Sequence, residues 1–221
     1  MIQKYLQKYK ILFGDTLFLE KRFHKPNLIR INKGYGEISK MDQELTLSCE
    51  SCQKKYKNHK FLFGYGNKNP KLFILIDSPS KFDLIKNKLI AGDQGKILKK
   101  ALNAINVEKD KDTYTTSFIK YLPESNRHIL LSEFENCISH ISLLIKNINP
   151  KVILLIGKVV SNLILKKETN IDNLRSNIFY YLGIPTIVTY HPASIIESKN
   201  LKNLFWKDIK LISSILENFN E

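Results

Sequence analysis

The chain has 221 residues, of which 43% are hydrophobic and 25% are charged, so it can bury one sizeable core, and its formal net charge is +14. No apolar run is long enough to cross a bilayer, and the first ten residues hold three lysines and no apolar secretion segment, so we expect a cytoplasmic protein that does not enter a membrane. The three cysteines argue against a disulfide framework in such a chain and leave metal binding or buried thiols.

The first 47 residues are the hardest part of the chain to assign. Residues 2–19 have the pattern of an amphipathic helix, whereas residues 21–40 are basic and contain Pro26, Gly34 and Gly36, which is typical of loops. We therefore treat residues 1–47 as an N-terminal extension of undetermined structure and residues 48–221 as one domain.

Apolar runs of strand length alternate with helix-length segments from residue 72 onwards. The predicted strands are residues 72–76, 114–118, 152–156 and 186–189. The predicted helices are residues 96–105, 132–148, 158–165 and 201–216. Apolar strands separated by helices form parallel sheets that are covered on both faces. The sequence therefore predicts an α/β fold, a three-layer α/β/α domain with a central, mainly parallel four-stranded sheet.

His191 follows the last predicted strand directly. Ligand sites in open α/β sheets lie at the carboxyl ends of the strands, which is where this histidine is expected. Pro192 stiffens the chain just past it, so the imidazole sits on a rigid elbow. His191 is therefore a candidate functional residue, and a plain strand-to-helix turn with an incidental histidine is the alternative.

The positive charge favours a partner made of phosphates, since the isoelectric point is near 9.5. Only four of the 35 basic residues are arginines, and such a lysine-rich surface can also be merely solvated. Lysines nevertheless flank the segments described next, namely Lys86, Lys88, Lys96, Lys199 and Lys202.

Five segments stand in a fixed order along the chain. They are residues 63–80 (FGYGNKNPKLFILIDSPS), 92–98 (GDQGKIL), 115–127 (TTSFIKYLPESNR), 150–157 (PKVILLIG), and the His191-Pro192-Ala193 elbow with its following helix. Together they resemble the family-four uracil-DNA glycosylases, which carry an iron–sulfur cluster, over roughly residues 49–216. The resemblance implies a monomeric DNA-repair hydrolase that binds single- or double-stranded DNA, flips out a deaminated base, and hydrolyses its N-glycosidic bond, with uracil as the first candidate.

The resemblance also implies the catalytic pair. His191 would donate a hydrogen bond to the carbonyl oxygen of the departing base, and Asp77 would hold the attacking water or balance the positive sugar. Asp77 is one methylene shorter than the acidic residue of the family, and the glycines around it are gone. The base-binding phenylalanine and asparagine of the family fall at Ile90 and Ser117. An isoleucine has no π-face and a serine cannot pair as an amide does, so base recognition is impaired or changed.

Further DNA contacts are implied around the elbow. The candidates are Pro192, Ala193, Ser194, Ile195, Arg127 and Lys199. Ile195 and Ile196 are the predicted apolar wedge that fills the gap left by the flipped nucleotide. A plain amphipathic helix face is the alternative for both isoleucines.

The cysteines depart from the family as well. Cys49, Cys52 and Cys137 fall where the resemblance implies three ligands of a four-iron four-sulfur cluster, but Tyr121 stands in place of the remaining cysteine. His140 lies three residues after Cys137 on a predicted helix, so the two side chains face the same way. Three outcomes stay open: a cluster with another ligand, a tetrahedral Cys₃His zinc site, or no metal.

Two function classes follow. Asp77 and His191 favour a DNA N-glycosylase with weakened base recognition. Ile90, Ser117 and Tyr121 favour a catalytically silent DNA-binding member of the same superfamily. A match of fold alone would instead predict a phosphate-binding or other small-molecule enzyme, but the chain has neither a Walker-type lysine loop nor a Gly-x-Gly-x-x-Gly motif.

Overall fold

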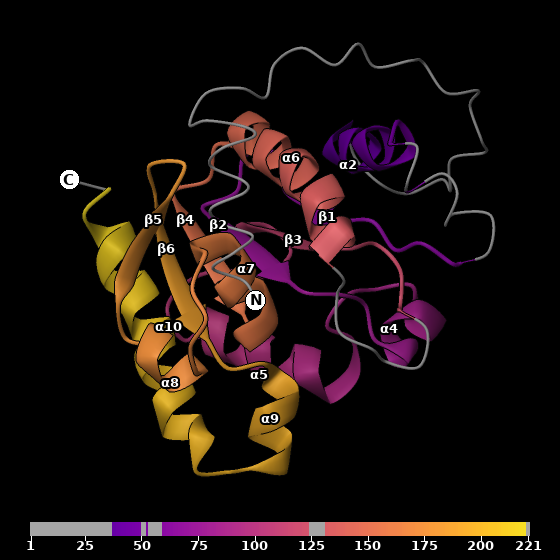
Figure 1. Cartoon of the computed structure of the whole chain (residues 1–221). Coiled ribbons are helices and arrows are strands. Elements are labelled where there is room, and N and C mark those ends of the chain that lie inside the picture. The colour runs from indigo at the N-terminus through magenta and orange to yellow at the C-terminus, as the bar shows by residue number, and fades with distance from the viewer. Residues whose placement is uncertain (1–36, 50–51, 53–58, 124–130, 220–221) are drawn as a thin grey trace.

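A six-stranded sheet runs through the centre of the molecule in the order β1-β3-β2-β4-β6-β5 (Figure 1). The computed structural model describes residues 37–49, 52, 59–123 and 131–219. The central strands are β3 (Thr113–Ser117), β2 (Leu72–Ile76), β4 (Val152–Ile156) and β6 (Ile184–Thr189), each parallel to its neighbour. Every residue of β2, β3 and β4 is buried, as expected of parallel strands between two helical layers. The predicted α/β fold with a mainly parallel central sheet is confirmed.

Two edge strands bring the sheet to six strands, not the four predicted. β1 (Tyr65–Gly66) pairs antiparallel with β3, and β5 (Ile178–Tyr181) pairs antiparallel with β6. Leu182 and Gly183 join β5 to β6 with φ values of 52° and 80°, the left-handed conformation that two-residue hairpin turns require. The side chains of β5 alternate between exposed and half-buried, so this strand has no continuous apolar run to reveal it.

Helices cover both faces of the sheet. In the described part of the chain they are α2 (Glu37–Leu47), α4 (Lys81–Lys86), α5 (Gly92–Asn103), α6 (Leu131–Ile148), α7 (Lys158–Leu165), α8 (Ile171–Leu174), α9 (Pro192–Glu197) and α10 (Leu201–Glu217). The predicted helices at 96–105, 132–148, 158–165 and 201–216 are confirmed as α5, α6, α7 and α10. The helix predicted at 2–19 lies outside the described residues. None of the described helices is long and apolar enough to span a membrane.

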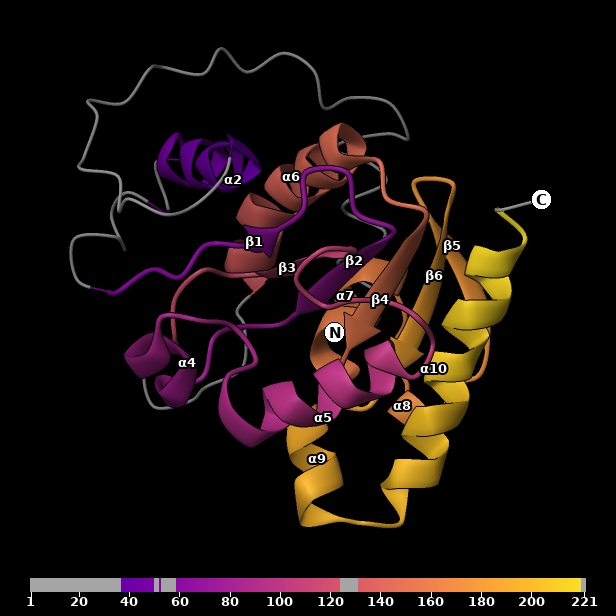
Figure 2. The same ribbon diagram turned by 180° about the vertical axis from the view of Figure 1, so that it is seen from behind.

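Alternate residues of the strands feed two separate cores. Phe73 and Leu75 of β2 pack on the face covered by α2, α6 and α7, while Leu72 and Ile74 pack on the face covered by α5, α9 and α10. Figure 1 shows α6 and α7 on the near side of the sheet, and the reverse view in Figure 2 shows α5 and α10. Cys52 and Cys137 belong to the first core, and Ile90 and Ile195 belong to the second.

The helix α2 begins inside the segment that the sequence predicts as loop. Residues 21–40 are predicted as loop, but residues 37–40 are helical, and α2 packs against α6. Asp42 of α2 is buried and forms an ion pair with Lys120 at 2.9 Å. The same carboxylate accepts hydrogen bonds from the N–H of Gly64 at 2.7 Å and from the hydroxyl of Thr116 at 3.1 Å. Buried contacts with the sheet therefore begin before residue 48.

Candidate active site and metal centre

The candidate site is a row of residues at the carboxyl edge of the sheet. Ser117 ends β3, Asp77 follows β2, Gly157 follows β4, and His191 comes just after β6. These strands are neighbours in the order β3-β2-β4-β6 and run parallel, so their ends meet at one edge. A Cβ atom on Gly157 would lie 3.9 Å from Cβ of His191, which places the histidine directly beside the end of β4.

His191 is held in one orientation by its own helix. It is the N-cap of α9, and its Nδ1 accepts a hydrogen bond from the backbone N–H of Ala193 at 3.2 Å. Burial lowers the pKa of His191, and the charges of Asp77 and Asp83 oppose this shift. The imidazole is therefore neutral at neutral pH, with its proton on Nε2. It can donate a hydrogen bond to an incoming oxygen without carrying a charge.

Asp77 lies next to Ser117 in the row. Ile76 pairs with Ser117 across β2 and β3, and the carbonyl of Asp77 accepts the N–H of Ile119 at 3.0 Å. Asp77 is half-buried, so its carboxylate can hold a water molecule near His191. The Ser117 side chain is fully buried, and its hydroxyl has no hydrogen-bond partner within the described residues. A buried hydroxyl without a partner is uncommon and suits a site that a ligand completes.

Ile90 lies in a tight loop between α4 and α5. Its side chain is buried and its backbone has a φ of 52°, a conformation that is strained for a β-branched residue. A Cβ atom on Gly95 would come within 2.2 Å of the carbonyl oxygen of Ile90. Only glycine at position 95 of α5 therefore lets the loop approach the helix so closely. The strained backbone of Ile90 and its close contact with Gly95 together define the position of the Ile90 side chain.

Asp83 braces this loop and is absent from the sequence-based candidates. One of its carboxylate oxygens accepts the N–H of Ala91 at 2.7 Å, and the other accepts the N–H of Ser80 at 2.9 Å. The hydroxyl of Ser80 in turn accepts the N–H of Asp83, which completes a capping box on α4. The spacing Ser-x-x-Asp at residues 80–83 is the sequence signal that identifies it.

The residues predicted to contact DNA differ in their exposure to solvent. Ile195 is only 6% exposed and packs into the core beneath α9, so it is not a wedge in this structure. Ile196 is 49% exposed and is the member of the pair that DNA can reach. Pro192 is buried, Ala193 and Ser194 are half-buried, and Lys199 is exposed. Arg127 lies outside the described residues.

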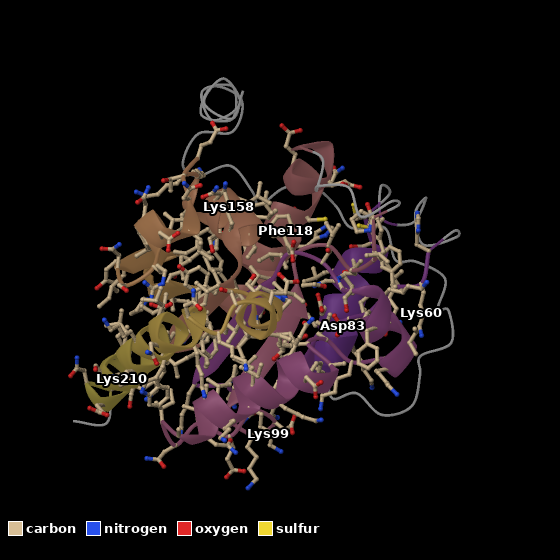
Figure 3. All side chains as sticks on the ribbon, turned by 90° about the horizontal axis from the view of Figure 1, so that it is seen from below. Lys60, Asp83, Lys99, Phe118, Lys158 and Lys210 are labelled. Carbon is tan, nitrogen blue, oxygen red and sulfur yellow. The ribbon has the colours of Figure 1, made fainter. Side chains whose placement is uncertain are left out.

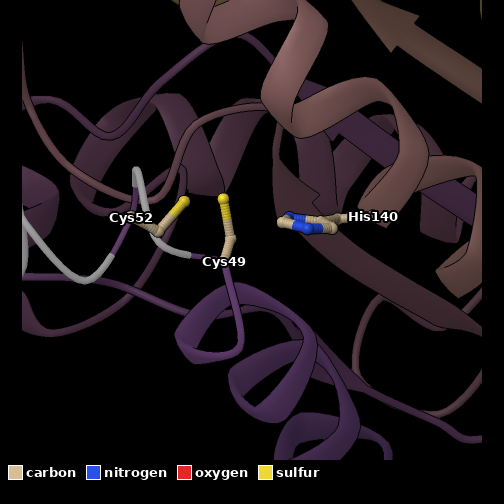
Figure 4. Close-up of side chains that lie close together, drawn as sticks. All are labelled: Cys49, Cys52 and His140. Carbon is tan, nitrogen blue, oxygen red and sulfur yellow. The ribbon is translucent and has the colours of Figure 1, made fainter. Parts of the chain in front are cut away.

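Two cysteines and a histidine gather between α2 and α6. The ligand atoms of Cys49, Cys52 and His140 lie within 4.8 Å of one another, and Figure 4 shows the three side chains converging. A hydrogen bond with Cys137, together with burial, raises the pKa of the Cys52 thiol to about 12, against the opposing hydrogen bond with Cys49. Burial lowers the pKa of His140 to about 4, so its imidazole is neutral and able to bind a metal ion.

Tyr121, at the remaining cluster position of the family, does not behave as a metal ligand here. Its hydroxyl donates a hydrogen bond to the carboxylate of Glu133. Its ring stacks on His59 with centroids 5.0 Å apart and packs against Phe61 at 5.4 Å. The phenol is therefore held by other partners, and the residues present do not fit a cluster that needs four thiolates.

A second buried residue that sequence reasoning missed supports the end of β6. Asp208 of α10 accepts the hydroxyl of Thr189 at 2.8 Å and forms an ion pair with Arg175 at 2.9 Å. Its side chain has no exposure to solvent. Thr189 stands two residues before His191, so this contact anchors the strand that delivers the histidine. No local spacing reveals a bond between residues so far apart in sequence.

The sequence that forms this site is similar to those of known proteins. A family model described as the uracil DNA glycosylase superfamily matches residues 63–210. The chain is 23% identical over 177 residues to a Type-4 uracil-DNA glycosylase of Archaeoglobus fulgidus, covering 76% of this chain and 88% of that protein. It is 23% identical over 176 residues to a Type-4 uracil-DNA glycosylase of Saccharolobus solfataricus, covering 76% of this chain and 82% of that protein.

A longer protein also matches. The chain is 28% identical over 160 residues to a DNA polymerase of Bacillus phage SP01, which covers 72% of this chain but only 17% of the polymerase. It thus spans most of the archaeal glycosylases and a small part of the viral protein. The family match runs from just before β1 into α10 and contains Asp77, Ile90, Ser117 and His191. Since it covers more than half of the sequence, the chain belongs to the uracil DNA glycosylase superfamily.

Proposed function

We propose that this protein is a DNA N-glycosylase, a hydrolase that removes a flipped deaminated base from DNA, with uracil as the first candidate. The observation that carries the proposal is the row of strand ends, where Ser117, Asp77 and His191 share one edge of the sheet. Ligand sites in open parallel sheets lie at this edge. Similarity to proteins named Type-4 uracil-DNA glycosylase supports the same reaction class.

His191 serves the step in which the glycosidic bond breaks. Both electrons of that bond leave with the base, so negative charge builds on the base carbonyl oxygen while the sugar becomes an oxocarbenium ion. A neutral imidazole whose Nδ1 is occupied by the N–H of Ala193 presents its Nε2–H to that oxygen. The hydrogen bond strengthens as the charge grows, and this is the condition for lowering the barrier.

Asp77 serves the sugar side of the same reaction. Its carboxylate offsets the positive charge at C1′ and orients a water molecule toward that carbon. The water oxygen then bonds to C1′ and its proton passes to the carboxylate or to solvent. Asp77 and His191 act on opposite charges of one transition state, which accords with their places on the same edge, after the two strands that flank β4.

Base capture is the weak step of the proposed reaction. Ile90 offers an apolar surface without a π-face, and Ser117 offers one hydroxyl where an amide would make a paired donor and acceptor contact. Both residues are buried, so neither adapts easily to a base of different shape. We therefore expect slow excision or a preference for another deaminated base.

We also propose that the protein acts on DNA as a monomer in the cytoplasm. The net charge of +14 supports a polyanionic partner. Exposed lysines are spread widely over the molecule, and Figure 3 shows Lys60, Lys99, Lys158 and Lys210 on different sides of it. Such a distribution favours general binding to phosphates, while Lys199 and Lys202 lie close to the proposed site in sequence.

The cysteine group, in this proposal, serves structure and not the reaction. Cys52 and Cys137 belong to the core on the side of α2 and α6, whereas Ile90 and Ile195 belong to the core on the side of α5 and α10. The sheet separates the two. A metal held by the cysteines would join α2 to α6 without touching the flipped base.

A catalytically silent DNA-binding protein is the second candidate, and the replacement at Ile90 and Ser117 favours it. The deciding experiment incubates the full chain with uracil-containing single- and double-stranded oligonucleotides and then cleaves abasic sites. We expect measurable cleavage that Asp77→Asn abolishes and that Glu108→Gln, at an exposed carboxylate, leaves unchanged. Absence of base release from uracil, hypoxanthine and xanthine substrates would establish the silent candidate.

A further inference from the structure

We propose that Cys49, Cys52, Cys137 and His140 bind a single tetrahedral zinc ion in place of the iron–sulfur cluster that the family resemblance implies. The inference concerns metal identity and does not depend on the excision reaction. It rests on the spacing of the ligand atoms, on the volume available to the metal, and on the environment of Tyr121.

The spacing fits one ion. The two thiol sulfurs of Cys49 and Cys52 and a ring nitrogen of His140 all lie within 4.8 Å of one another. Ligands of one tetrahedral zinc ion, with bonds of about 2.3 Å to sulfur and about 2.0 Å to nitrogen, lie roughly 3.5 to 3.8 Å apart. The four thiolates of a four-iron cluster instead bind four different irons and stand farther apart. A small contraction of the three residues completes a zinc site.

Cys137 is the fourth ligand. Its side chain lines the same small cavity as Cys52 and His140, although its sulfur lies outside the tight group of three atoms. Cys137 and His140 are three residues apart on α6, so they occupy the same face of the helix. A turn of the Cys137 side chain brings its sulfur to the ion. Three cysteines and one histidine are a standard ligand set for structural zinc.

The empty space beside Cys52, Cys137 and His140 is small, and Cys49 does not line it. A cavity of about 10 Å³ lies against Cys52, Cys137 and His140, with Tyr121 and Phe61 on its other walls. This is about the space that one water molecule needs. Four irons and four sulfides would have to displace Tyr121 and Phe61, which are packed against each other.

Tyr121 blocks the remaining cluster position. Its hydroxyl is committed to Glu133, and its ring is stacked on His59. On the other side, Lys120 holds its ammonium group against Asp42 within the buried interior. A zinc ion with three thiolates and a neutral imidazole carries one negative charge, which is attracted to the nearby ammonium of this ion pair. Zinc has no redox chemistry, so the site would be a structural link between α2 and α6.

The experiment measures metal content in the full chain purified without chelators from cells supplied with both iron and zinc. We expect about one zinc per chain, no acid-labile sulfide, and no visible absorption. Cys52→Ser should lower the zinc content and the melting temperature together, because metal binding and folding are coupled. Ser139→Ala, on α6 next to His140, is the matched control and should change neither.

Two further measurements keep the inference testable if a ligand variant fails to fold. Cobalt(II) added to metal-free wild-type protein should give the intense visible bands of a tetrahedral thiolate site. Tyr121→Cys, which supplies a fourth thiol in the family position, should gain iron and sulfide on anaerobic reconstitution, whereas wild type should not. Wild-type protein that carries iron with sulfide, or that binds neither zinc nor cobalt, would overturn the proposal whatever its excision activity.

Discussion

His191 accepts a hydrogen bond from the backbone N–H of Ala193 through its Nδ1 atom, at 3.2 Å. A nitrogen that accepts a hydrogen bond carries no proton, so the proton of the neutral ring is on Nε2. Adding a second proton would place two N–H groups against each other and break the N-cap of α9. The protonation state of the ring and the geometry of the elbow are therefore linked.

This link predicts how acid affects stability. Burial lowers the pKa of His191 below its ordinary value of 6.5, so the unfolded chain binds the proton more tightly than the folded one. The stability of the folded protein should be unaffected by this group above pH 6.5 and should fall as the pH drops below that value. Urea unfolding of wild type and His191→Gln from pH 7.5 to 5 measures the effect, since glutamine does not titrate. A difference between the two proteins that stays constant across this range would contradict the prediction.

Removing the imidazole predicts a kinetic loss without a binding loss. His191→Ala should reduce turnover on uracil-containing DNA by about 10²- to 10³-fold, because one hydrogen bond to developing charge is lost. Affinity for the same oligonucleotide should change little, because the contact strengthens only in the transition state. Single-turnover kinetics and a fluorescence binding assay separate the two quantities. A parallel loss of affinity and turnover would show that His191 binds DNA in the ground state.

The sequence predicts the inner strands well and the edges poorly, for a physical reason. β2 and β4 are buried along their whole length, so each appears as an uninterrupted apolar run and its bounds match the prediction. β5 has only half its side chains turned inward and follows a run of polar residues. A two-residue strand such as β1 carries no pattern, because its existence depends on its partner β3.

The candidate site shows the same division. The Cys-x-x-Cys pair and the position of His140 one turn after Cys137 are local relations, and the structure brings Cys49, Cys52 and His140 together. Neighbouring helix positions point about 100° apart, so Ile195 and Ile196 cannot both face DNA, and the structure buries Ile195. The ion pair of Arg175 with Asp208 joins separate elements and has no local signature.

That ion pair predicts a large loss of stability when one partner is removed. Asp208→Asn leaves the guanidinium of Arg175 buried without its counter-charge, so the free energy of unfolding should fall by about 3 to 5 kcal/mol. The matched control is Asp93→Asn, which breaks a pair with Lys96 whose side chains are 76% and 80% exposed, and it should change the free energy of unfolding far less. Urea denaturation of both variants tests this. If the two variants lose the same amount of stability, the buried charge of Arg175 does not explain the effect of Asp208→Asn.

DNA binding is predicted to be electrostatic. If about six phosphates are contacted, affinity should drop by about 10³-fold between 50 and 200 mM salt. Lys199→Gln, just beyond α9, should weaken binding and reduce the salt slope by about one. Lys146→Gln near the end of α6, which leads into the amino end of β4, removes the same charge far from the proposed site and should leave the slope unchanged. A flat salt response of wild type would remove nucleic acid as the partner.

Restoring the base-binding side chains is predicted to raise uracil excision. Ser117→Asn returns an amide to the end of β3, where the native hydroxyl has no partner among the described residues. Ile90→Phe returns an aromatic face and removes a β-branched residue from a backbone φ of 52°. The double variant should therefore exceed wild type in single-turnover excision of uracil, provided that thermal melting shows it to be folded. Ser214→Asn on α10, at an exposed serine, serves as the control for adding an amide and should have no effect. If wild type shows no excision and the folded double variant shows none either, the enzymatic proposal is refuted. Catalysis would then fail with both recognition groups and both catalytic groups in place.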